Sequence, residues 1–311
     1  MHFLVVGPGA MGTLFSVRLS QAGHQVALLD YKAKRAESIG KKGLRLEDVT
    51  GEVSVHVPVV TSPTPAPVDV VLICVKATQT LTAARDIAGR LPPQANILTL
   101  QNGLGNVEIL QKIFGEGRVF GGVTSEGATL MAPGHARHAG RGETFIGPAG
   151  SAQDREDAVK SMVSAFREAG FDTRSTDEVE SLIWGKLIVN VGINALTALT
   201  RLKNGRLPEI SGAHMLMEKA VGEAVQVAQA KGIPLPYPEP LERVVTVCRA
   251  TADNVASMLQ DILAEKPTEV AFINGAVVRE GEKQGIATPV NFTLSCLVET
   301  LQETYDQRVN P

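Results

Sequence analysis

The amino-terminal stretch decides the fold, and it reads Phe3-Leu4-Val5-Val6-Gly7-Pro8-Gly9-Ala10-Met11-Gly12. A short apolar run typical of a buried strand ends there in a turn with the spacing Gly-x-Gly-x-x-Gly. Gly7 permits a tight turn, Gly9 lets the backbone approach a pyrophosphate, and Gly12 lets a helix pack closely on the strand. The helix that opens here and ends near Gly23 adds amide donors and a partial positive charge. Within a strand–helix–strand unit, residues 7–12 therefore predict dinucleotide binding rather than a bare structural turn.

The first part of the chain alternates short apolar runs with helical segments, which is typical of a parallel sheet. The runs that predict strands are Phe3–Val6, Gln25–Leu29, Val68–Val75, Asn96–Leu100 and 171–175. Residues 43–60 predict a hairpin insertion, and the three prolines in the loop 61–67 exclude a helix there. The glycine-rich residues 115–150 predict further strands at the edge of the same sheet, and residues 154–168 predict an amphipathic helix.

Beyond residue 178, long apolar segments recur without the short alternating runs that are typical of strands, which predicts helices. The expected helices are 179–199, 214–231, 241–248, 252–263, 269–284 and 289–306. Thr288 and Pro289 suit a helix start, and Gly232 suits a helix end. We therefore expect an α/β protein with an amino-terminal Rossmann dinucleotide-binding domain over residues 1–176 and an all-helical substrate and catalytic domain over residues 177–311.

The composition excludes several function classes. The chain has 311 residues, with 30 Lys and Arg against 33 Asp and Glu, so it carries no electrostatic footprint for nucleic acid. Its three cysteines, Cys74, Cys248 and Cys296, are widely spaced, which argues against a disulfide framework and fits a reducing cytoplasm. The first residues lack a basic region, and no uninterrupted apolar stretch reaches membrane-spanning length, so neither a signal peptide nor a membrane partner is expected.

Metal binding is not predicted. His135 and His138 lie three residues apart in a glycine-rich basic stretch, with no carboxylate or thiol run nearby in the sequence to complete a site.

Two polar positions follow predicted strands at the points where a parallel sheet gathers its ligands. Lys76 follows the run that ends at Val75, and Gln101-Asn102-Gly103 follows residues 97–100. Lys76 could equally be a solvated lysine, and Asn102-Gly103 could be an ordinary Asn-Gly turn. Position alone does not decide between these interpretations.

A polar row interrupts the apolar segment 184–196. Lys186, Asn190 and Asn194 recur every four residues, so they share one face of a helix. A buried lysine is costly without a partner, and the row therefore indicates a cavity or cleft. The alternative is the solvated stripe of an amphipathic helix, but such stripes usually carry several charges.

A second candidate lies further along the chain, where Ser257-Met258-Leu259-Gln260-Asp261 is followed by Glu269. Glu269 opens an apolar segment expected to be helical. A carboxylate there often serves only the helix dipole, and Glu269 alone favours that interpretation.

Taken together, these motifs resemble the ketopantoate reductase family (2-dehydropantoate 2-reductase), and the resemblance spans nearly the whole chain. The motifs are Gly7-x-Gly9-x-x-Gly12, Lys76, Asn102-Gly103, the Lys186-Asn190-Asn194 helix, and Ser257 to Asp261 with Glu269. Members of this family pair a Rossmann domain with a helical domain. They reduce ketopantoate to pantoate, usually with NADPH, on the route to pantothenate and coenzyme A.

The resemblance implies roles for individual residues. Lys186 is expected to donate a proton to the developing alkoxide, and Glu269 to bind the substrate hydroxyl and order the lysine. Substrate contacts are expected from Asn190, Asn194, Asn254 and Ser257, with Asn254 one helical turn before Ser257. Lys76 and Asn102 are expected near the nicotinamide end of the cofactor. This chemistry suits the residue types, because hydride transfer to C2 of a 2-oxo acid creates an oxyanion that an ammonium group can stabilise and protonate.

Cofactor choice stays open. Many NADPH-using members place an arginine just after the second strand, whereas this chain has Asp30-Tyr31-Lys32. Asp30 can accept hydrogen bonds from the adenosine ribose and would repel a 2′-phosphate, which favours NAD. Lys32, Lys34 or Arg35 could instead hold that phosphate, and Asp30 could merely cap the next helix. The resemblance implies NADP, while Asp30 predicts better use of NADH than in NADPH-specific relatives.

Three functions are therefore compared. The leading one is NAD(P)H-dependent reduction of ketopantoate, and the first alternative is reduction of another 2-oxo acid. The second alternative is a nucleotide-responsive binding protein without catalysis, which the joint presence of Lys186, Asn190, Asn194 and Glu269 disfavours. The resemblance also makes a homodimer possible.

Overall fold

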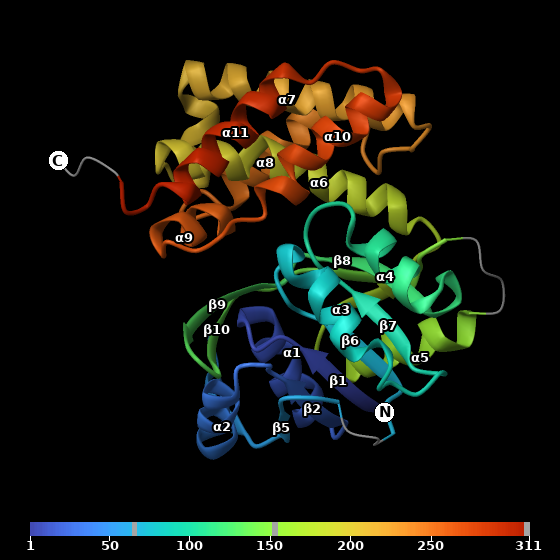
Figure 1. Cartoon of the computed structure of the whole chain (residues 1–311). Helices are drawn as coiled ribbons and strands as arrows, with labels where there is room; N and C mark the ends of the chain where they lie inside the picture. Colours follow the sequence, from blue (N-terminus) through green and yellow to red (C-terminus); the bar gives the residue numbers. More distant parts are fainter. Residues whose placement is uncertain (64–66, 151–154, 308–311) are drawn as a thin grey trace. The chain divides into compact units, whose positions relative to one another are not determined.

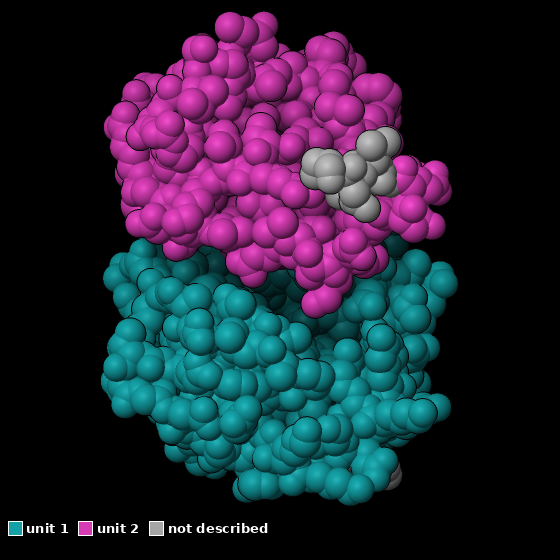
Figure 2. All heavy atoms as spheres, turned by 90° about the vertical axis from the view of Figure 1, so that its left-hand side faces the viewer, with its two compact units in different colours: residues 1–101, 106–179 teal, residues 102–105, 180–311 magenta. Residues whose placement is uncertain are grey.

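The computed structural model describes residues 1–63, 67–150 and 155–307, and the chain forms two compact units (Figures 1 and 2). Unit 1 comprises residues 1–101 and 106–179, and unit 2 comprises residues 102–105 and 180–311. Residues 64–66 of the predicted proline loop and Asp154 at a predicted helix start lie outside the described residues. The short segment 102–105 thus leaves the sheet unit and joins the helical one.

Unit 1 is built on an eight-stranded sheet with the order β12-β11-β8-β7-β6-β1-β2-β5. Its strands are β1 (His2–Val6), β2 (Gln25–Leu29), β5 (Val59–Val60), β6 (Val70–Ile73), β7 (Asn96–Thr99), β8 (Val119–Thr124), β11 (Thr144–Pro148) and β12 (Thr173–Ser175). β8 and β11 pair antiparallel, and the other neighbours pair parallel. The α/β fold class and the five strands predicted from apolar runs are confirmed.

The apolar side chains of the central strands contribute to two hydrophobic cores, one on each face of the sheet. This follows because successive side chains of a strand point to opposite faces. Phe3 and Val5 join the core formed with α1 (Ala10–Gln21) and α5 (Glu156–Glu168). Leu4 and Val6 join the core on the other face, formed with α3 (Thr80–Ala88) and α4 (Asn106–Phe114). The remaining helical elements of unit 1 are α2 (Ala33–Lys42), η1 (Ala77–Gln79) and η2 (Glu116–Arg118). Figure 1 shows this layered arrangement of helices and sheet.

A second sheet, with the order β4-β3-β10-β9, packs on α1. It contains the predicted hairpin, as β3 (Leu44–Asp48) and β4 (Gly51–Val55), together with β9 (Gly127–Ala132) and β10 (His135–Gly140). The prediction that all strands of residues 115–150 extend the main sheet was wrong for β9 and β10. The hairpin leaves one edge of β3 unpaired, and β10 pairs with that edge in parallel.

Unit 2 is helical, as predicted. Its elements are α6 (Val179–Thr200), η3 (Asn204–Glu209), α7 (Ser211–Ala230), α8 (Pro240–Ala250), α9 (Ser257–Leu263), η4 (Val270–Phe272), α10 (Asn274–Gln284) and α11 (Pro289–Glu303). α6 is long and apolar enough to cross a membrane by length and composition, but 67% of its most apolar window is buried inside the protein. That burial is typical of the central helix of a globular core.

Two helices of unit 2 begin five residues after their predicted starts. The helix expected from residue 252 begins only at Ser257, because Asn254 turns back toward Thr251 and its carbonyl accepts a hydrogen bond from the Asn204 amide. The helix expected from Glu269 begins only at Asn274. There the Phe272 carbonyl accepts a hydrogen bond from the Leu104 amide at 2.9 Å. This bond replaces one that a continuous α-helix would make with that carbonyl.

The predicted start of the last helix is confirmed, but its cap comes from elsewhere. Pro289 is the first residue of α11, and the Thr288 side chain makes no capping bond. The Glu223 carboxylate accepts the Val290 and Asn291 amides at 2.8 and 2.9 Å instead. Gly232 also follows the end of α7, with a φ of +70°. α11 itself ends at Glu303, three residues before the predicted end.

Candidate active site

The glycine turn forms between the end of β1 and the start of α1. The Gly7 amide donates to the Leu29 carbonyl at 3.0 Å, which ties the turn to β2. A Cβ on Gly12 would lie 1.9 Å from the Gly7 carbonyl oxygen, so only glycine allows this close approach. α1 begins at Ala10, and no described side chain caps it. The first-turn amides of residues 10–12 are therefore left for a group of negative charge, and a dinucleotide pyrophosphate would fit them.

The corner after β2 holds an ion pair that the sequence did not predict. Asp30 is fully buried, and its two carboxylate oxygens accept the Arg35 guanidinium at 2.5 and 2.7 Å. Oδ1 also accepts the Lys32 amide at 3.0 Å. This hydrogen bond to Asp30 raises the pKa of Arg35. Asp30 was expected to accept hydrogen bonds from the adenosine ribose or to cap the next helix, and in the structure Arg35 neutralises its charge. Lys32 and Lys34 are exposed.

A pocket of about 200 Å³ adjoins this corner. Its lining includes Val6 and Leu29 at the carboxyl ends of β1 and β2, Tyr31 and Thr61 from the following loops, and Ala83 and Arg90 from the α3 side. Apolar walls with a partly exposed tyrosine at the rim suit a flat aromatic group. The carboxyl ends of parallel strands are where an open sheet binds nucleotides.

Lys76 and Gln101 follow β6 and β7 as predicted. Lys76 is half-buried and begins the turn η1. The Gln101 side-chain amide donates to the Val75 carbonyl at 2.6 Å and to the Thr80 hydroxyl at 2.9 Å. Gln101 therefore fixes the backbone just before Lys76.

The Asn102-Gly103 segment is a turn that docks on the chain around Glu269. The Leu104 amide donates to the Phe272 carbonyl, three residues after Glu269. Gly103 has a φ of +83°, and a Cβ there would lie 2.3 Å from the Phe272 carbonyl oxygen. The backbone bends at Asn102-Gly103, and tertiary structure joins this bend to the second candidate site, while the contact of Asn102 with the cofactor stays a prediction.

The polar row of α6 is not a solvated stripe. Asn194 is buried, and Lys186 and Asn190 are half-buried. The Asn190 side-chain nitrogen is buried and has no hydrogen-bond partner among the described residues. A buried amide donor without a partner costs free energy, and an oxygen of a ligand would satisfy it.

The back of α6 is held beside Lys186. Pro236 packs so closely on Gly185 that a Cβ on this glycine would lie 2.5 Å from its ring. The Tyr237 hydroxyl donates to the Gly185 carbonyl at 2.5 Å. Burial raises the pKa of Tyr237 to about 12, so it remains a hydrogen-bond donor at neutral pH. These contacts fix the helix turn from which the Lys186 side chain extends.

Lys186 and Glu269 form an electrostatic pair within unit 2. Glu269 is buried, and it lies in the short segment between α9 and η4. Burial lowers the pKa of Lys186 to about 8, and the attraction of Glu269 partly opposes that shift. At pH 7 such a lysine is protonated by about ten to one, yet it releases its proton more readily than an ordinary lysine.

The remaining predicted substrate residues lie near the start of α9. Ser257 is the first residue of this helix and is exposed. Asn254 is also exposed, and it lies in the loop before the helix rather than one helical turn earlier.

Two histidine pairs were missed by sequence reasoning. His135 lies 2.7 Å from Glu47, and His138 contacts Glu126, so carboxylates distant in sequence do lie near both histidines. Only the pairing of β10 with β3 and the turn before β9 bring them together. The possible ligand atoms of Glu47, Glu52 and His135 lie within 4.8 Å of one another. Arg137 and Arg45 already pair with the two glutamates, which disfavours a cation there.

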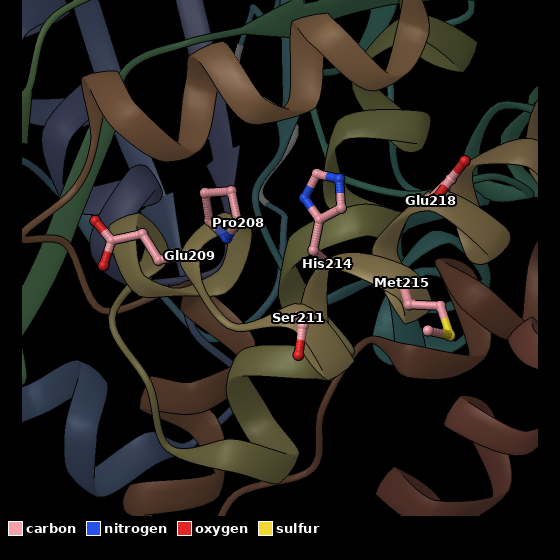
Figure 3. A pocket seen from close by; sticks show the side chains of 6 residues that line it. All are labelled: Pro208, Glu209, Ser211, His214, Met215 and Glu218. Atoms are coloured by element: carbon pink, nitrogen blue, oxygen red, sulfur yellow. The ribbon is translucent and has the colours of Figure 1, made fainter.

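A wider hollow of about 390 Å³ lies on unit 2 (Figure 3). It is lined by Pro208, Glu209, Ser211, His214, Met215 and Glu218. None of these residues belongs to the predicted site. The volume of a hollow therefore does not by itself identify the place where the reaction occurs.

Comparison with known proteins shows to which family the chain is similar. The family Ketopantoate reductase PanE/ApbA matches residues 3–151, and its carboxy-terminal counterpart matches residues 178–302. The 2-dehydropantoate 2-reductase of Halobacterium salinarum is 39% identical over 97% of this chain and 99% of its own length. The enzyme of the same name from Vibrio cholerae is 33% identical over 99% of this chain and its own full length.

Solved structures agree with the sequence matches. A PanE/ApbA family ketopantoate reductase from Ralstonia eutropha is 31% identical, with a TM-score of 0.90 over 99% of this chain and 100% of its own. A D-mandelate dehydrogenase solved with NADH and anilino(oxo)acetate is 29% identical, with a TM-score of 0.91 over 98% of this chain and 100% of its own.

Proposed function

This chain belongs to the ketopantoate reductase family, and on that premise we propose that it reduces 2-dehydropantoate (ketopantoate) to pantoate with a reduced nicotinamide cofactor. The observation that carries the proposal is the polar row of α6. A lysine with a pKa of about 8 lies there with an unpartnered buried amide and an acidic partner, Glu269. A helix of a purely structural domain needs none of these groups.

The protein's own residues divide the work of the reaction. The cofactor supplies the hydride to C2 of the 2-oxo acid. Lys186 stabilises the negative charge that develops on the C2 oxygen and transfers its proton to that oxygen. Asn190 and Asn194 orient the oxygens of the substrate without adding charge, and Ser257 and Asn254 contribute further contacts from the start of α9.

Glu269 is proposed to accept a hydrogen bond from the terminal hydroxyl of ketopantoate. The same carboxylate keeps Lys186 protonated, because its charge raises the lysine pKa. A 2-oxo acid without that hydroxyl would leave the buried Glu269 carboxylate without the contact, so we expect it to be a poorer substrate.

The pyrophosphate and the adenine of the cofactor would be held by residues of unit 1. The amides of residues 9–12 would bind the pyrophosphate, and the pocket beside Tyr31 would take the adenine. Lys76 and Asn102 would lie toward the nicotinamide. This assignment rests on the first-turn amides of α1 and on the close approach that Gly12 allows.

We further propose that the cofactor is NADPH. Arg35 neutralises Asp30, and the exposed Lys32 and Lys34 leave the corner after β2 with a net positive charge. A 2′-phosphate is attracted to such a corner, whereas a free Asp30 would have repelled it. The pairing with Arg35 thus argues against the NADH preference that the sequence position of Asp30 indicated.

The test is turnover of the purified protein, followed as oxidation of reduced cofactor with ketopantoate, 2-oxoisovalerate and pyruvate. We expect the highest kcat/KM with ketopantoate. Equal kcat/KM for 2-oxoisovalerate would favour a reductase of another 2-oxo acid. No turnover with any of the three would favour a nucleotide-responsive binding protein.

The setting follows from the same proposal. The substrate is a small 2-oxo acid, and we expect no nucleic-acid or membrane partner. A cytoplasmic enzyme, with a homodimer as a possible assembly, fits the widely spaced cysteines and the family.

A further inference from the structure

The segment that carries Glu269 is fixed from both sides by residues distant in sequence. On one side, Thr268 is almost fully buried, and both its amide and its hydroxyl donate to the side-chain oxygen of Gln302 at 2.9 Å. On the other side, the Phe272 carbonyl accepts the Leu104 amide. Glu269 directly precedes the short turn η4, where its carbonyl accepts the Phe272 amide at 2.9 Å, so its backbone is held by a single turn and not by an α-helix.

The Thr268 hydroxyl extends this arrangement past Glu269. It accepts the Val270 amide at 3.3 Å while it donates to Gln302. The residues before and after Glu269 are therefore tied to one side-chain amide in the last turn of α11. Tyr305, just beyond that helix, also donates to the Lys266 carbonyl at 3.0 Å.

We propose that Gln302 and Thr268 are positioning residues for Glu269, so that the end of α11 acts on the reaction through this carboxylate. The inference rests on the proposed role of Glu269 in the reaction. Neither residue touches the substrate in this proposal. They hold the backbone on both sides of a buried acidic side chain, in a segment that is otherwise fixed by a single short turn and not by an α-helix.

The geometry has a measurable consequence for Lys186. The attraction of Glu269 raises the pKa of this lysine against the effect of burial, and the strength of an attraction between charges falls with distance. If Glu269 is released, we expect the Lys186 pKa to fall. A merely structural contact between α11 and the segment would leave that pKa unchanged.

The experiment compares Gln302→Leu and Thr268→Val with Glu269→Gln. Thr268→Ser keeps the hydroxyl and serves as the conservative variant. Thr300→Val is the matched control, because Thr300 is exposed and its hydroxyl donates only within α11. The Lys186 pKa is read by NMR titration of protein with labelled lysines, with Lys186→Ala used to assign the signal, and kinetics are measured beside it.

We expect Gln302→Leu and Thr268→Val to lower the Lys186 pKa in the same direction as Glu269→Gln. We also expect them to reduce kcat/KM for ketopantoate by about tenfold, the effect that loss of two neutral hydrogen bonds permits. Thr268→Ser and Thr300→Val should match the wild type. In the double variant Gln302→Leu with Glu269→Gln, the Gln302 substitution should add nothing, because both act through one group.

An unchanged Lys186 pKa in Gln302→Leu and Thr268→Val overturns the inference, whatever their thermal stability. Additive losses in the double variant overturn it as well. If Gln302→Leu does not fold, the comparison of Thr268→Val with Thr268→Ser decides the question. The NMR measurement needs no turnover, so an inactive wild type would refute the proposed function and still leave the positioning inference to be decided by the lysine pKa.

Discussion

The glycine turn of unit 1 and the Glu269 segment of unit 2 are fixed in opposite ways. The close approach within the turn is local, because Gly12 lies against the Gly7 carbonyl only five residues earlier, and one hydrogen bond from the Gly7 amide to Leu29 ties the turn to β2. The Glu269 segment is held by Gln302 and Leu104, which are distant in the sequence. Backbone sites that close locally are visible in a sequence pattern, whereas a side chain that depends on distant partners is not.

The two regions also differ in what a single substitution can remove. A backbone site loses function when a side chain intrudes on it, because its donors are backbone amides, which every residue except proline carries. A side-chain site loses function when one charged group is deleted. The predictions below probe each region by the change to which it is sensitive.

The largest effect is expected for Lys186→Ala. Removal of the proton donor should lower kcat by on the order of 10² or more, since general acid catalysis is commonly worth that much. Affinity for the cofactor should barely change, because the glycine turn proposed to bind the pyrophosphate lies in unit 1, whereas Lys186 lies in unit 2. Steady-state turnover and cofactor fluorescence titration measure the two quantities, and near-normal kcat would remove Lys186 from the proposed mechanism.

Gly12→Ala should destabilise the glycine turn of unit 1. The added Cβ would meet the Gly7 carbonyl oxygen at 1.9 Å, and relief of such overpacking costs about 1–3 kcal/mol of stability. We expect a lower melting temperature and cofactor binding weakened by about tenfold, the factor that 1.4 kcal/mol represents. Gly89→Ala is the matched control, because a Cβ there meets no atom within 4 Å and the φ of −79° suits alanine. Equal behaviour of the two variants would mean that the turn tolerates a side chain.

The pH dependence sharpens the role of Glu269. Reduction requires protonated Lys186, so kcat/KM should fall as pH rises through about 8. Glu269→Gln removes the attraction that raises the lysine pKa, and the fall should therefore move to lower pH. The KM for ketopantoate should rise at the same time. A pH profile that does not move in Glu269→Gln would separate this carboxylate from the lysine.

The smallest effect concerns the corner after β2. Arg35→Ala frees the Asp30 carboxylate, and the ratio of kcat/KM for NADPH over NADH should fall by about fivefold, or about 1 kcal/mol for a charge near the surface. Asp30→Ala frees Arg35 instead, and the ratio should rise by a similar factor. If neither variant changes the ratio, this ion pair does not read the ribose.

Much of the fold could be predicted because its signals are local. The apolar runs of β1, β2, β6 and β7, the polar row of α6, and Pro289 at a helix start are all properties of neighbouring residues. The row Lys186, Asn190 and Asn194 could be assigned to one helix face from spacing alone, because the helical period fixes it.

The sequence by itself determined the strand–turn–helix at residues 7–12, the change from a sheet to helices near residue 178, and which face of α6 is polar. Tertiary structure alone decided that β9 and β10 leave the main sheet, that Arg35 closes on Asp30, and that Gln302 ties down the residue before Glu269. The physical reason is the range of the interactions. Periodicity and turn geometry act within a few residues, whereas the hydrogen bonds that orient Glu269 join groups that meet only after the helices have packed.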